Sequence, residues 1–380
     1  MEKKSFKILI FLVSILISQY SYLFSQNYII DDKVSEELIV KGIDKLYNYE
    51  FEEAEVFFKK LKVRLPHHPV YPLLMAMMTY WKMMPAFDNK ALFNKQEAYL
   101  ARVIELSDSL LENDENNVEL FYAKLAAHSY LSLLHSETNN QFQAINEARK
   151  AYTYMKKGFK LKEQYPEFYF STGLYNYYVV QYPETHPLYK PFMFFFPGGD
   201  KQKGLEQLKL AAEKAVFSKI EALEYLAHIY LKYESSPDEA IEFTQKLVDR
   251  YPKNLYMVTR HTEALIASAK FEDARSLISK LLNSGNDFFI MAGQLFVGIT
   301  QEKYKQNYSI AKTRYLKAIT SGNKFEDFAH EYVSFAYTGL ARIAIKEGND
   351  KKAEKYYKKA LDLTEYKWVI EEAEGYLNDK

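Results

Sequence analysis

The sequence predicts an all-α protein built as one elongated array of antiparallel helix pairs. At 380 residues the chain exceeds the size of a usual single core, so it forms either several domains or one repeat array. The chain has only 13 Gly and 11 Pro, which are too few to form the many turns of an all-β fold of this length. A recurring pattern of small and aromatic residues, described next, then favours repeated helix pairs.

The clearest repeat unit lies near the end of the chain, at residues 337–363. Small and aromatic residues occupy its key positions: Leu340, Ala341, Gly348, Ala353, Tyr357 and Ala360. Small residues let two antiparallel helices approach closely, and a large ring fills the space beside them. At these positions the unit resembles the tetratricopeptide repeat family.

The same spacing recurs upstream, once in full and several times in part. The first copy contains Gly42, Ala54, Phe58 and Pro66. Later copies contain Ala227, Tyr230, Ala240 and Pro252, then Ala274 and Ile278, then Ala311, Tyr315 and Ala318. The resemblance implies a right-handed α-solenoid of about eight helix pairs with a C-terminal capping helix.

This pattern divides the chain into segments. We expect a linker at 26–34, helix pairs over 35–166, a pair at 167–219 interrupted by an insertion at 182–199, repeats over 220–364 and a capping helix at 365–380. Between residues 69 and 166 the family positions are not matched. Two long second helices, over 92–112 and 141–164, are expected there.

The N-terminus predicts export. Lys3, Lys4 and Lys7 precede an apolar run over residues 8–17, and small and polar residues follow up to Ser25. This arrangement is typical of a signal peptide, cut after Ser25 so that Gln26 becomes the first residue. An uncleaved anchor is the alternative, although the apolar run is shorter than the ~20 residues of a spanning helix. The residues around the expected cleavage site resemble those at the end of signal peptides in some Gram-negative bacteria. We therefore expect a soluble periplasmic protein without a transmembrane span.

Composition argues against several functional classes. Fifty basic residues balance 50 acidic ones without a long block of either sign, so nucleic acid is not an expected partner. The absence of cysteine removes thiol catalysis and Cys-ligated metal. Neither a phosphate-loop motif, a Gly-x-Ser-x-Gly motif nor a metal-binding histidine spacing occurs. We therefore expect no catalysis, cofactor or metal, and we interpret Gly198-Gly199 as a tight turn before an N-cap at Asp200.

The insertion at 182–199 is the least repeat-like stretch. It carries four prolines, at 183, 187, 191 and 197, which predicts that no helix runs through it. Aromatic residues fill 13 of the 32 positions from Tyr165 to Phe196. The rings either pack back onto the array or present a binding lip, for which the candidates are Tyr182, His186, Tyr189 and Phe192.

In the tetratricopeptide family the first helices of successive pairs line a groove that holds an extended peptide or a partner helix. One branch grips C-terminal carboxylates with Lys and Asn. Here Ile39, Ile43, Thr338 and Arg342 occupy the corresponding places, so that clamp is not implied. The groove candidates are Tyr177, Tyr178, Glu224, His228, Arg260 and Arg342.

Taken together, these features predict an exported scaffold that binds a protein or peptide partner in the cell envelope. Mixed charges with aromatic residues suit a protein surface better than a single charged ligand. Small-molecule or glycan binding under the aromatic insertion is the alternative. An enzyme ranks last, because no acid, base and nucleophile constellation is found.

Overall fold

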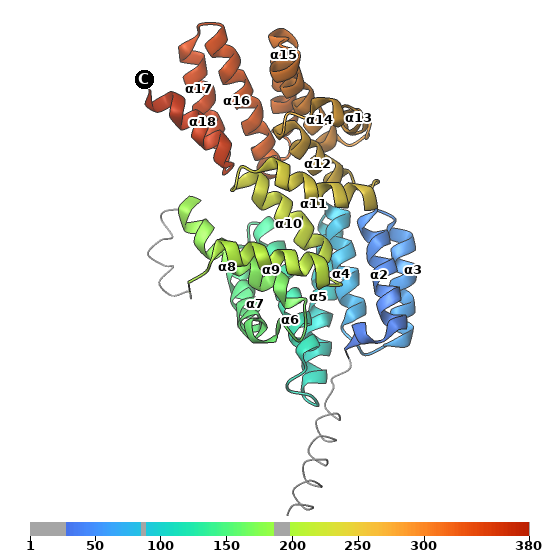
Figure 1. Ribbon diagram of the computed structural model, residues 1–380. Coiled ribbons are helices and arrows are strands. Elements are labelled where there is room, and N and C mark those ends of the chain that lie inside the picture. The colour runs from blue at the N-terminus through green and yellow to red at the C-terminus, as the bar shows by residue number, and fades with distance from the viewer. Residues whose placement is uncertain (1–27, 85–88, 186–197, 380) are drawn as a thin grey trace, which may run out of the picture.

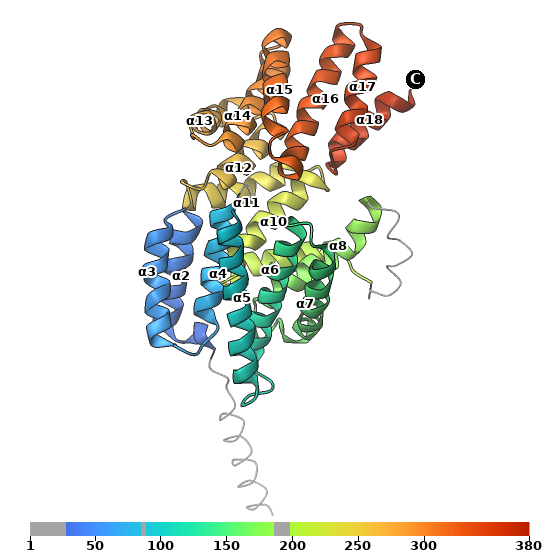
Figure 2. The same cartoon turned by 180° about the vertical axis from the view of Figure 1, so that it is seen from behind.

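The computed structural model describes residues 28–84, 89–185 and 198–379, and these form helices joined by short connections (Figures 1 and 2). The first helices of the pairs are α2 (Lys33–Tyr47), α4 (Val70–Met83), α6 (Val118–Glu137), α8 (Phe168–Thr185), α10 (Lys219–Lys232), α12 (Leu255–Ala267), α14 (Asp287–Ile299) and α16 (His330–Lys346). Their partners are α3 (Phe51–Arg64), α5 (Lys90–Leu111), α7 (Gln141–Leu161), α9 (Lys201–Lys214), α11 (Pro237–Arg250), α13 (Phe271–Leu282), α15 (Tyr308–Gly322) and α17 (Asp350–Leu361).

Three short helical segments and a final helix complete the described chain: η1 (Ile29–Asp31), the π-helical turn η3 (Thr300–Tyr304), η4 (Glu326–Ala329) and α18 (Lys367–Asn378). The prediction of an α-solenoid with eight helix pairs and a terminal helix is therefore confirmed. No helix in the described ranges combines the length and the apolar character needed to cross a membrane.

The predicted contacts between small and aromatic residues hold the pairs together. A Cβ atom added at Gly42 would lie 2.3 Å from the ring of Phe58, the partner expected in the first repeat. Tyr315 is wedged in the same way between Gly298 and Gly339, where added Cβ atoms would lie 2.8 and 2.4 Å from its ring. Glycine is needed at these places because the ring occupies the volume of any larger side chain.

A residue with left-handed backbone conformation marks the turn inside each of the six pairs whose connecting residues are all described. It ends the first helix at Tyr49, Asn139, Ser235, Ala269, Gln306 and Gly348. Five positions later a buried alanine packs the second helix, at Ala54, Ala144, Ala240, Ala274, Ala311 and Ala353. In the last unit the Asn349 N–H donates to the Ala344 carbonyl at 2.9 Å, which satisfies a free carbonyl of the helix end.

Glycine should stabilise the left-handed turn where the present residue has a Cβ. Ala269 is exposed with a φ of 57°, and that conformation strains an L-residue by ~1–2 kcal/mol. We expect Ala269→Gly to raise the free energy of unfolding by ~0.5–1 kcal/mol, after the entropic penalty of glycine is subtracted. Ala267→Gly, two residues earlier in the exposed end of α12, should lower it by a similar amount. Urea unfolding of both variants checks the opposite signs, and equal shifts would contradict the turn geometry.

The N-terminal pair closes back onto the middle of the chain. Figure 1 shows α2 and α3 beside α11 and α12, and side-chain bonds join them. Arg250 makes a bidentate ion pair with Asp44 at 2.8 and 2.9 Å, and the Asn254 amide donates to the Tyr47 carbonyl at 2.9 Å. One apolar core therefore extends from Ile29 to Met257, and a second spans Leu231 to Val369 in the C-terminal pairs.

The start of the insertion is helical, contrary to the prediction. Helix α8 continues past Pro183 to Thr185. A proline in the last turn removes one backbone hydrogen bond only, so the helix survives for two more residues. At the return of the insertion, Gly199 lies against the α8 backbone, where an added Cβ would be 2.5 Å from the Asn176 carbonyl. Asp200 then caps α9 by accepting from the Lys203 N–H at 3.0 Å, as predicted.

The N-terminal limit of the fold differs slightly from the expected one. Helix α2 begins at Lys33, two residues before the predicted start at Ser35, because Asp32 is its N-cap and accepts from the Ser35 N–H at 3.2 Å. The proposed signal peptide, residues 1–25, belongs to a part of the chain that the structure does not describe.

Candidate functional site

Partly exposed aromatic rings gather where the first helices face one another. The α4 helix meets α12 there, since the rings of Trp81 and Tyr256 lie 5.9 Å apart although three helix pairs lie between theirs in the sequence. First helices thus face the inside of the array. We name their cluster of rings the inner tyrosine face: Tyr80, Tyr130, Tyr178, Tyr225, His228, Tyr233 and Tyr256.

Ring contacts join the members of the inner tyrosine face into two groups. Tyr80 of α4 and Tyr130 of α6 have centroids 5.6 Å apart. On the other side, Tyr233 follows α10 and lies 5.9 Å from Tyr178 of α8 and 6.0 Å from His228. Each of these rings keeps some solvent exposure, which distinguishes them from the fully buried core tyrosines. Such rings offer apolar area and a polar tip at the same time.

Helical spacing explains why α10 contributes most to this face. Tyr225, His228 and Lys232 are three and four residues apart, so they lie on one side of the helix. Ala222, Leu226, Ala227 and Ile229 on the other side are buried against neighbouring helices. The sequence of α10 therefore separates a packing side from a side that looks into the array.

Desolvation keeps the ionisable groups of the face neutral. Burial raises the pKa of Tyr225 to about 12. Burial, together with the nearby cations Arg260 and Lys232, holds the pKa of His228 well below its usual value. His228 is consequently an uncharged ring at neutral pH, with hydrogen-bonding nitrogens beside Tyr225 and Tyr233.

Arg260 of α12 is the fixed cation at the edge of the face. Its guanidinium lies 3.1 Å from Glu263 and 3.5 Å from Glu224. It also donates to the Tyr256 and Tyr366 hydroxyls, both at 3.1 Å. These bonds hold the arginine in place and orient Tyr256 toward the inside.

The structure brings together four of the residues that the sequence suggested: Tyr178, Glu224, His228 and Arg260 all lie at the inner tyrosine face. Tyr177 is buried and its hydroxyl donates to Glu234, so it serves packing. Arg342 is bound to Glu302 and Glu372 in the C-terminal pairs. Tyr182 is 41% exposed near the end of α8.

Three further candidates, His186, Tyr189 and Phe192, lie outside the ranges that the structure describes. The binding-lip and glycan hypotheses for the insertion depend on them, so both stay predictions.

Sequence reasoning missed five of the rings, Tyr80, Tyr130, Tyr225, Tyr233 and Tyr256. Tyr225 and Tyr256 could have been found from the sequence, because each lies three or four residues from a suggested residue and so shares its side of the helix. Tyr80 and Tyr130 come from residues 69–166, where family positions are not matched and the inward side of a helix is therefore not identified.

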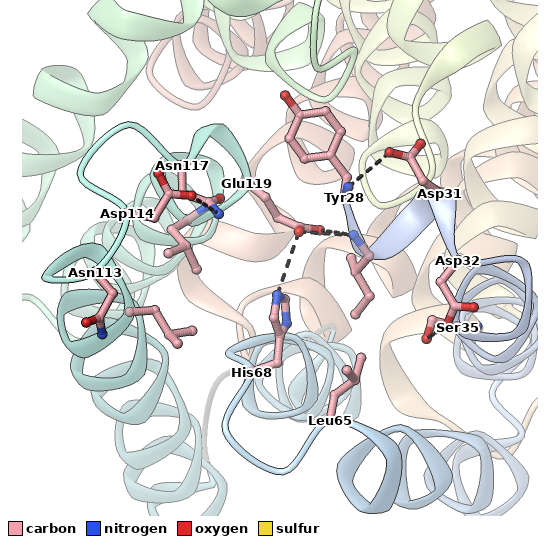
Figure 3. Close-up of a pocket in the computed structure, with 13 residues that line it drawn as sticks. Tyr28, Asp31, Asp32, Ser35, Leu65, His68, Asn113, Asp114, Asn117 and Glu119 are labelled. Carbon is pink, nitrogen blue, oxygen red and sulfur yellow. Dashed lines mark hydrogen bonds and ion pairs between the residues drawn. The ribbon is translucent and has the colours of Figure 1, made fainter. Parts of the chain in front are cut away.

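A separate hollow of about 600 Å³ lies at the N-terminal end of the array (Figure 3). Glu119 projects into it and accepts from the Ile29 N–H at 3.1 Å, with the His68 Nε2 atom 3.7 Å away (Figure 3). Tyr165 also donates to Glu119, at 3.3 Å. The central polar group of this hollow is thus engaged in anchoring the start of the fold, and the inner tyrosine face is the stronger candidate for an external ligand.

Comparisons with known proteins return similar folds only. No family model matches the sequence, and no match is found among curated proteins. Solved structures with a similar arrangement include yeast Tom70, at 12% identity and a TM-score of 0.39, covering 95% of this chain and 84% of that one. They also include the human IFIT1 dimer with PPP-AAAA, at 17% identity, a TM-score of 0.41 and coverage of 82% and 68%.

The TPR domain of P58(IPK) matches with 13% identity, a TM-score of 0.24 and coverage of 90% of this chain and 98% of that one. These likenesses are too distant to define a family. The assignment as an α-solenoid rests on the helix pairs and repeated contacts described above. Within the described residues, no group of three or more His, Cys, Asp or Glu is arranged to hold a metal ion.

Proposed function

We propose that the chain is a non-catalytic scaffold that binds a protein or peptide partner on the inner tyrosine face. The observation that carries the proposal is the set of partly exposed rings that five successive first helices supply to the inside of the array. Solenoids of stacked pairs form extended concave surfaces, and tyrosine is enriched in the energetically dominant parts of protein interfaces. Arg260 and Glu224 at its edge add directional polar contacts.

We also propose that the scaffold works outside the cytoplasm, as a soluble periplasmic protein. The basic start, the apolar run over residues 8–17 and the absence of cysteine support this location. Mass spectrometry of the N-terminus of the protein from the envelope fraction tests it. A mature chain that begins at Gln26 is expected, and retention of residues 1–25 would overturn the proposal.

Site-directed photo-crosslinking in living cells tests partner binding. A benzophenone side chain introduced by Tyr225→p-benzoylphenylalanine should give one discrete adduct of higher mass, because that ring faces the inside of the array. Phe142→p-benzoylphenylalanine is the matched control, since Phe142 of α7 is 73% exposed on a second helix. No adduct is expected there. Adding Tyr80→Leu, which removes a neighbouring inner ring at similar volume, should weaken the adduct at position 225.

Two results would contradict the proposal. Equal adducts at positions 225 and 142 would indicate random collisions rather than a site. If the variant with the benzophenone side chain at position 225 melts like the original protein but gives no adduct, the inner tyrosine face is not occupied by a partner.

A further inference from the structure

A second hollow, of about 500 Å³, lies between the second helices α11 and α13. Its volume is within the ~300–1,000 Å³ range of small-molecule sites. Ile241 and Val248 of α11 and Leu277 of α13 line its walls and are partly exposed. Helix α12 closes the hollow from beneath, where the lining residues Val258 and Leu265 are buried. The hollow therefore offers a ligand an apolar space with a closed floor.

His261 is the polar side chain of this floor. It lies three residues after Val258 and four before Leu265, so the three share one side of α12. Tyr256 and Arg260 project from another side of the same helix, at the inner tyrosine face. Only 3% of the surface of His261 is exposed, although it lines the hollow. One buried ring thus places nitrogen atoms in an otherwise apolar floor.

Thr244 determines which nitrogen of His261 carries the proton. The His261 Nδ1 atom lies 2.8 Å from the Thr244 hydroxyl oxygen. That hydroxyl is 3.0 Å from the Ala240 carbonyl, which can only accept, so its single proton is donated there. Thr244 then accepts from the Nδ1–H group, and Nε2 carries a lone pair instead of a proton. Burial lowers the pKa of His261, which favours this uncharged form of the ring.

The Nε2 atom of His261 opens onto the hollow without a partner. No residue in the described part of the chain forms a hydrogen bond with it, and it is not fully shielded from solvent. Since the side chain is otherwise buried, the hollow is the way by which solvent reaches it. An acceptor nitrogen in apolar surroundings is stabilised by a ligand that donates a hydrogen bond to it.

The charged residues around the hollow balance one another. Asp249 and Asp273 carry two negative charges, and Lys270 and Lys280 carry two positive ones. Lys270 is in addition paired with Asp238 at 3.0 Å. An ion would meet no net charge at this rim and would lose its hydration against the apolar floor. These surroundings favour a neutral ligand.

We propose that the hollow binds a small neutral aromatic molecule with one ring N–H group, of the indole or pyrrole class, and that this N–H donates to the His261 Nε2 atom. An aromatic N–H donates without accepting, which matches a floor that offers an acceptor and no donor. A hydroxyl or an amide would bring an acceptor that no floor residue satisfies. The site is independent of the proposed function, because no member of the inner tyrosine face lines this hollow.

Calorimetric titration of the purified protein with indole tests the proposal. The matched control is 1-methylindole, which has the same ring system without the N–H group. We expect indole to bind at one site, and 1-methylindole to bind at least ~5-fold more weakly. Equal affinities would overturn the proposal. Tighter binding of N-acetyltryptophanamide than of indole would also overturn it, and would assign the hollow to a tryptophan side chain of another protein.

Variants on the exposed rim locate the bound indole without disturbing the core. Ser276 of α13 is exposed and lines the hollow, so Ser276→Trp should fill it and weaken indole binding by ~10-fold or more. Ser279 is exposed on the same helix outside the lining, and Ser279→Trp should change the affinity by less than ~2-fold. Equal effects in two variants that melt alike would place the indole elsewhere and overturn the site.

Nuclear magnetic resonance examines the histidine directly. Two-bond proton–nitrogen correlations of protein labelled with ¹⁵N-histidine report which ring nitrogen is protonated, and His261→Gln identifies the signals of this residue. We expect an unprotonated Nε2 in the free protein, with a signal that moves toward the protonated position when indole is added. A proton on Nε2 in the free protein at neutral pH would contradict the geometry from which the ligand was inferred.

Discussion

Replacing Arg342 with alanine is expected to lower the free energy of unfolding by ~3–5 kcal/mol. The guanidinium donates to both oxygens of Glu302, at 2.6 and 2.9 Å, and to Glu372 at 3.1 Å. The side chain of Glu302 is only 5% exposed and also accepts from the Tyr315 hydroxyl at 2.5 Å. Without the arginine, a carboxylate remains buried with no cation, and this penalty makes the effect large.

Urea unfolding of Arg342→Ala beside Arg102→Ala measures this effect. Arg102 pairs with Glu105 on the surface and is 47% exposed, so its loss should change stability by less than ~1 kcal/mol. Arg342→Lys keeps the charge but loses the bidentate geometry, and an intermediate loss is expected. If Arg342→Ala behaved like Arg102→Ala, the ion-pair network would not stabilise the fold. Unchanged cross-linking at position 225 in a folded Arg342→Lys variant would separate this role from partner binding.

Replacing Glu221 with glutamine is expected to make the protein more stable above neutral pH. Glu221 of α10 accepts from the Tyr47 hydroxyl where the N-terminal pair closes onto the array, and from Tyr130 at 3.5 Å. Its second oxygen is buried and accepts no hydrogen bond from any residue that the structure describes. Burial raises the pKa of Glu221 from 4.5 to about 7.

The direction of the pH effect follows from proton binding. Between pH ~4.5 and ~7 the folded protein holds a proton on Glu221 that the unfolded chain has released. The contribution of Glu221 to the free energy of unfolding is therefore complete below pH ~4.5 and is lost as the pH rises through ~7. Glutamine stays neutral at every pH. The variant should therefore gain up to ~3 kcal/mol over the original protein at pH 8, and close to nothing at pH 4.

Urea unfolding of the Glu221→Gln variant and the original protein across this pH range measures the difference. Glu52→Gln, at an exposed position on α3, is the control and should show little difference at any pH. A stability difference for Glu221→Gln that stays constant from pH 4 to pH 8 would show that the carboxyl does not titrate in this range.

The ends of the array were predictable from the sequence because close helix contacts there need particular residues. Gly42 faces the ring of Phe58 at a distance that excludes a Cβ, and both residues belong to the repeat pattern seen in the sequence. The turns were harder to find. Of the six left-handed turn residues only Gly348 is a glycine, and Tyr49 or Gln306 give no such signal in the sequence. Strain at these turns is tolerated because the packing of both helices fixes the backbone.

The candidate site was predictable only where the repeat frame is regular. Glu224, His228 and Arg260 were found because residues 220–267 follow the frame closely enough to identify the inward side. Arg342 fits the same frame, yet its partner Glu302 lies in the π-helical turn η3, which leaves no pattern in the sequence. Long-range charge pairing of this kind decides whether an inward arginine is available to a ligand or held by its own chain.

The high tyrosine content could not be interpreted from the sequence, which contains 33 of them. In the described chain many tyrosine hydroxyls donate to carboxylates, for instance Tyr251 to Asp44 at 2.8 Å and Tyr366 to Glu263 at 2.6 Å. Such pairs let a large ring enter the core while its polar end stays bonded. Rings at the inner tyrosine face differ only in keeping part of their surface open, and that difference depends on tertiary structure.

Closure of α2 onto α11 and α12 changes how the chain can fold. In an open solenoid each repeat touches only its neighbours, so folding can start anywhere and spread along a line. Here the bond between Tyr251 and Asp44 joins residues 207 positions apart. Such a contact requires a long loop to be closed before it contributes, which slows the assembly of the N-terminal pairs and makes them unfold cooperatively. The pairs after α12 are tied back over a shorter separation, since the Tyr366 hydroxyl donates to Glu263, 103 positions away. Both parts of the solenoid therefore contain long loops that must close during folding, and the longer loop lies in the N-terminal part.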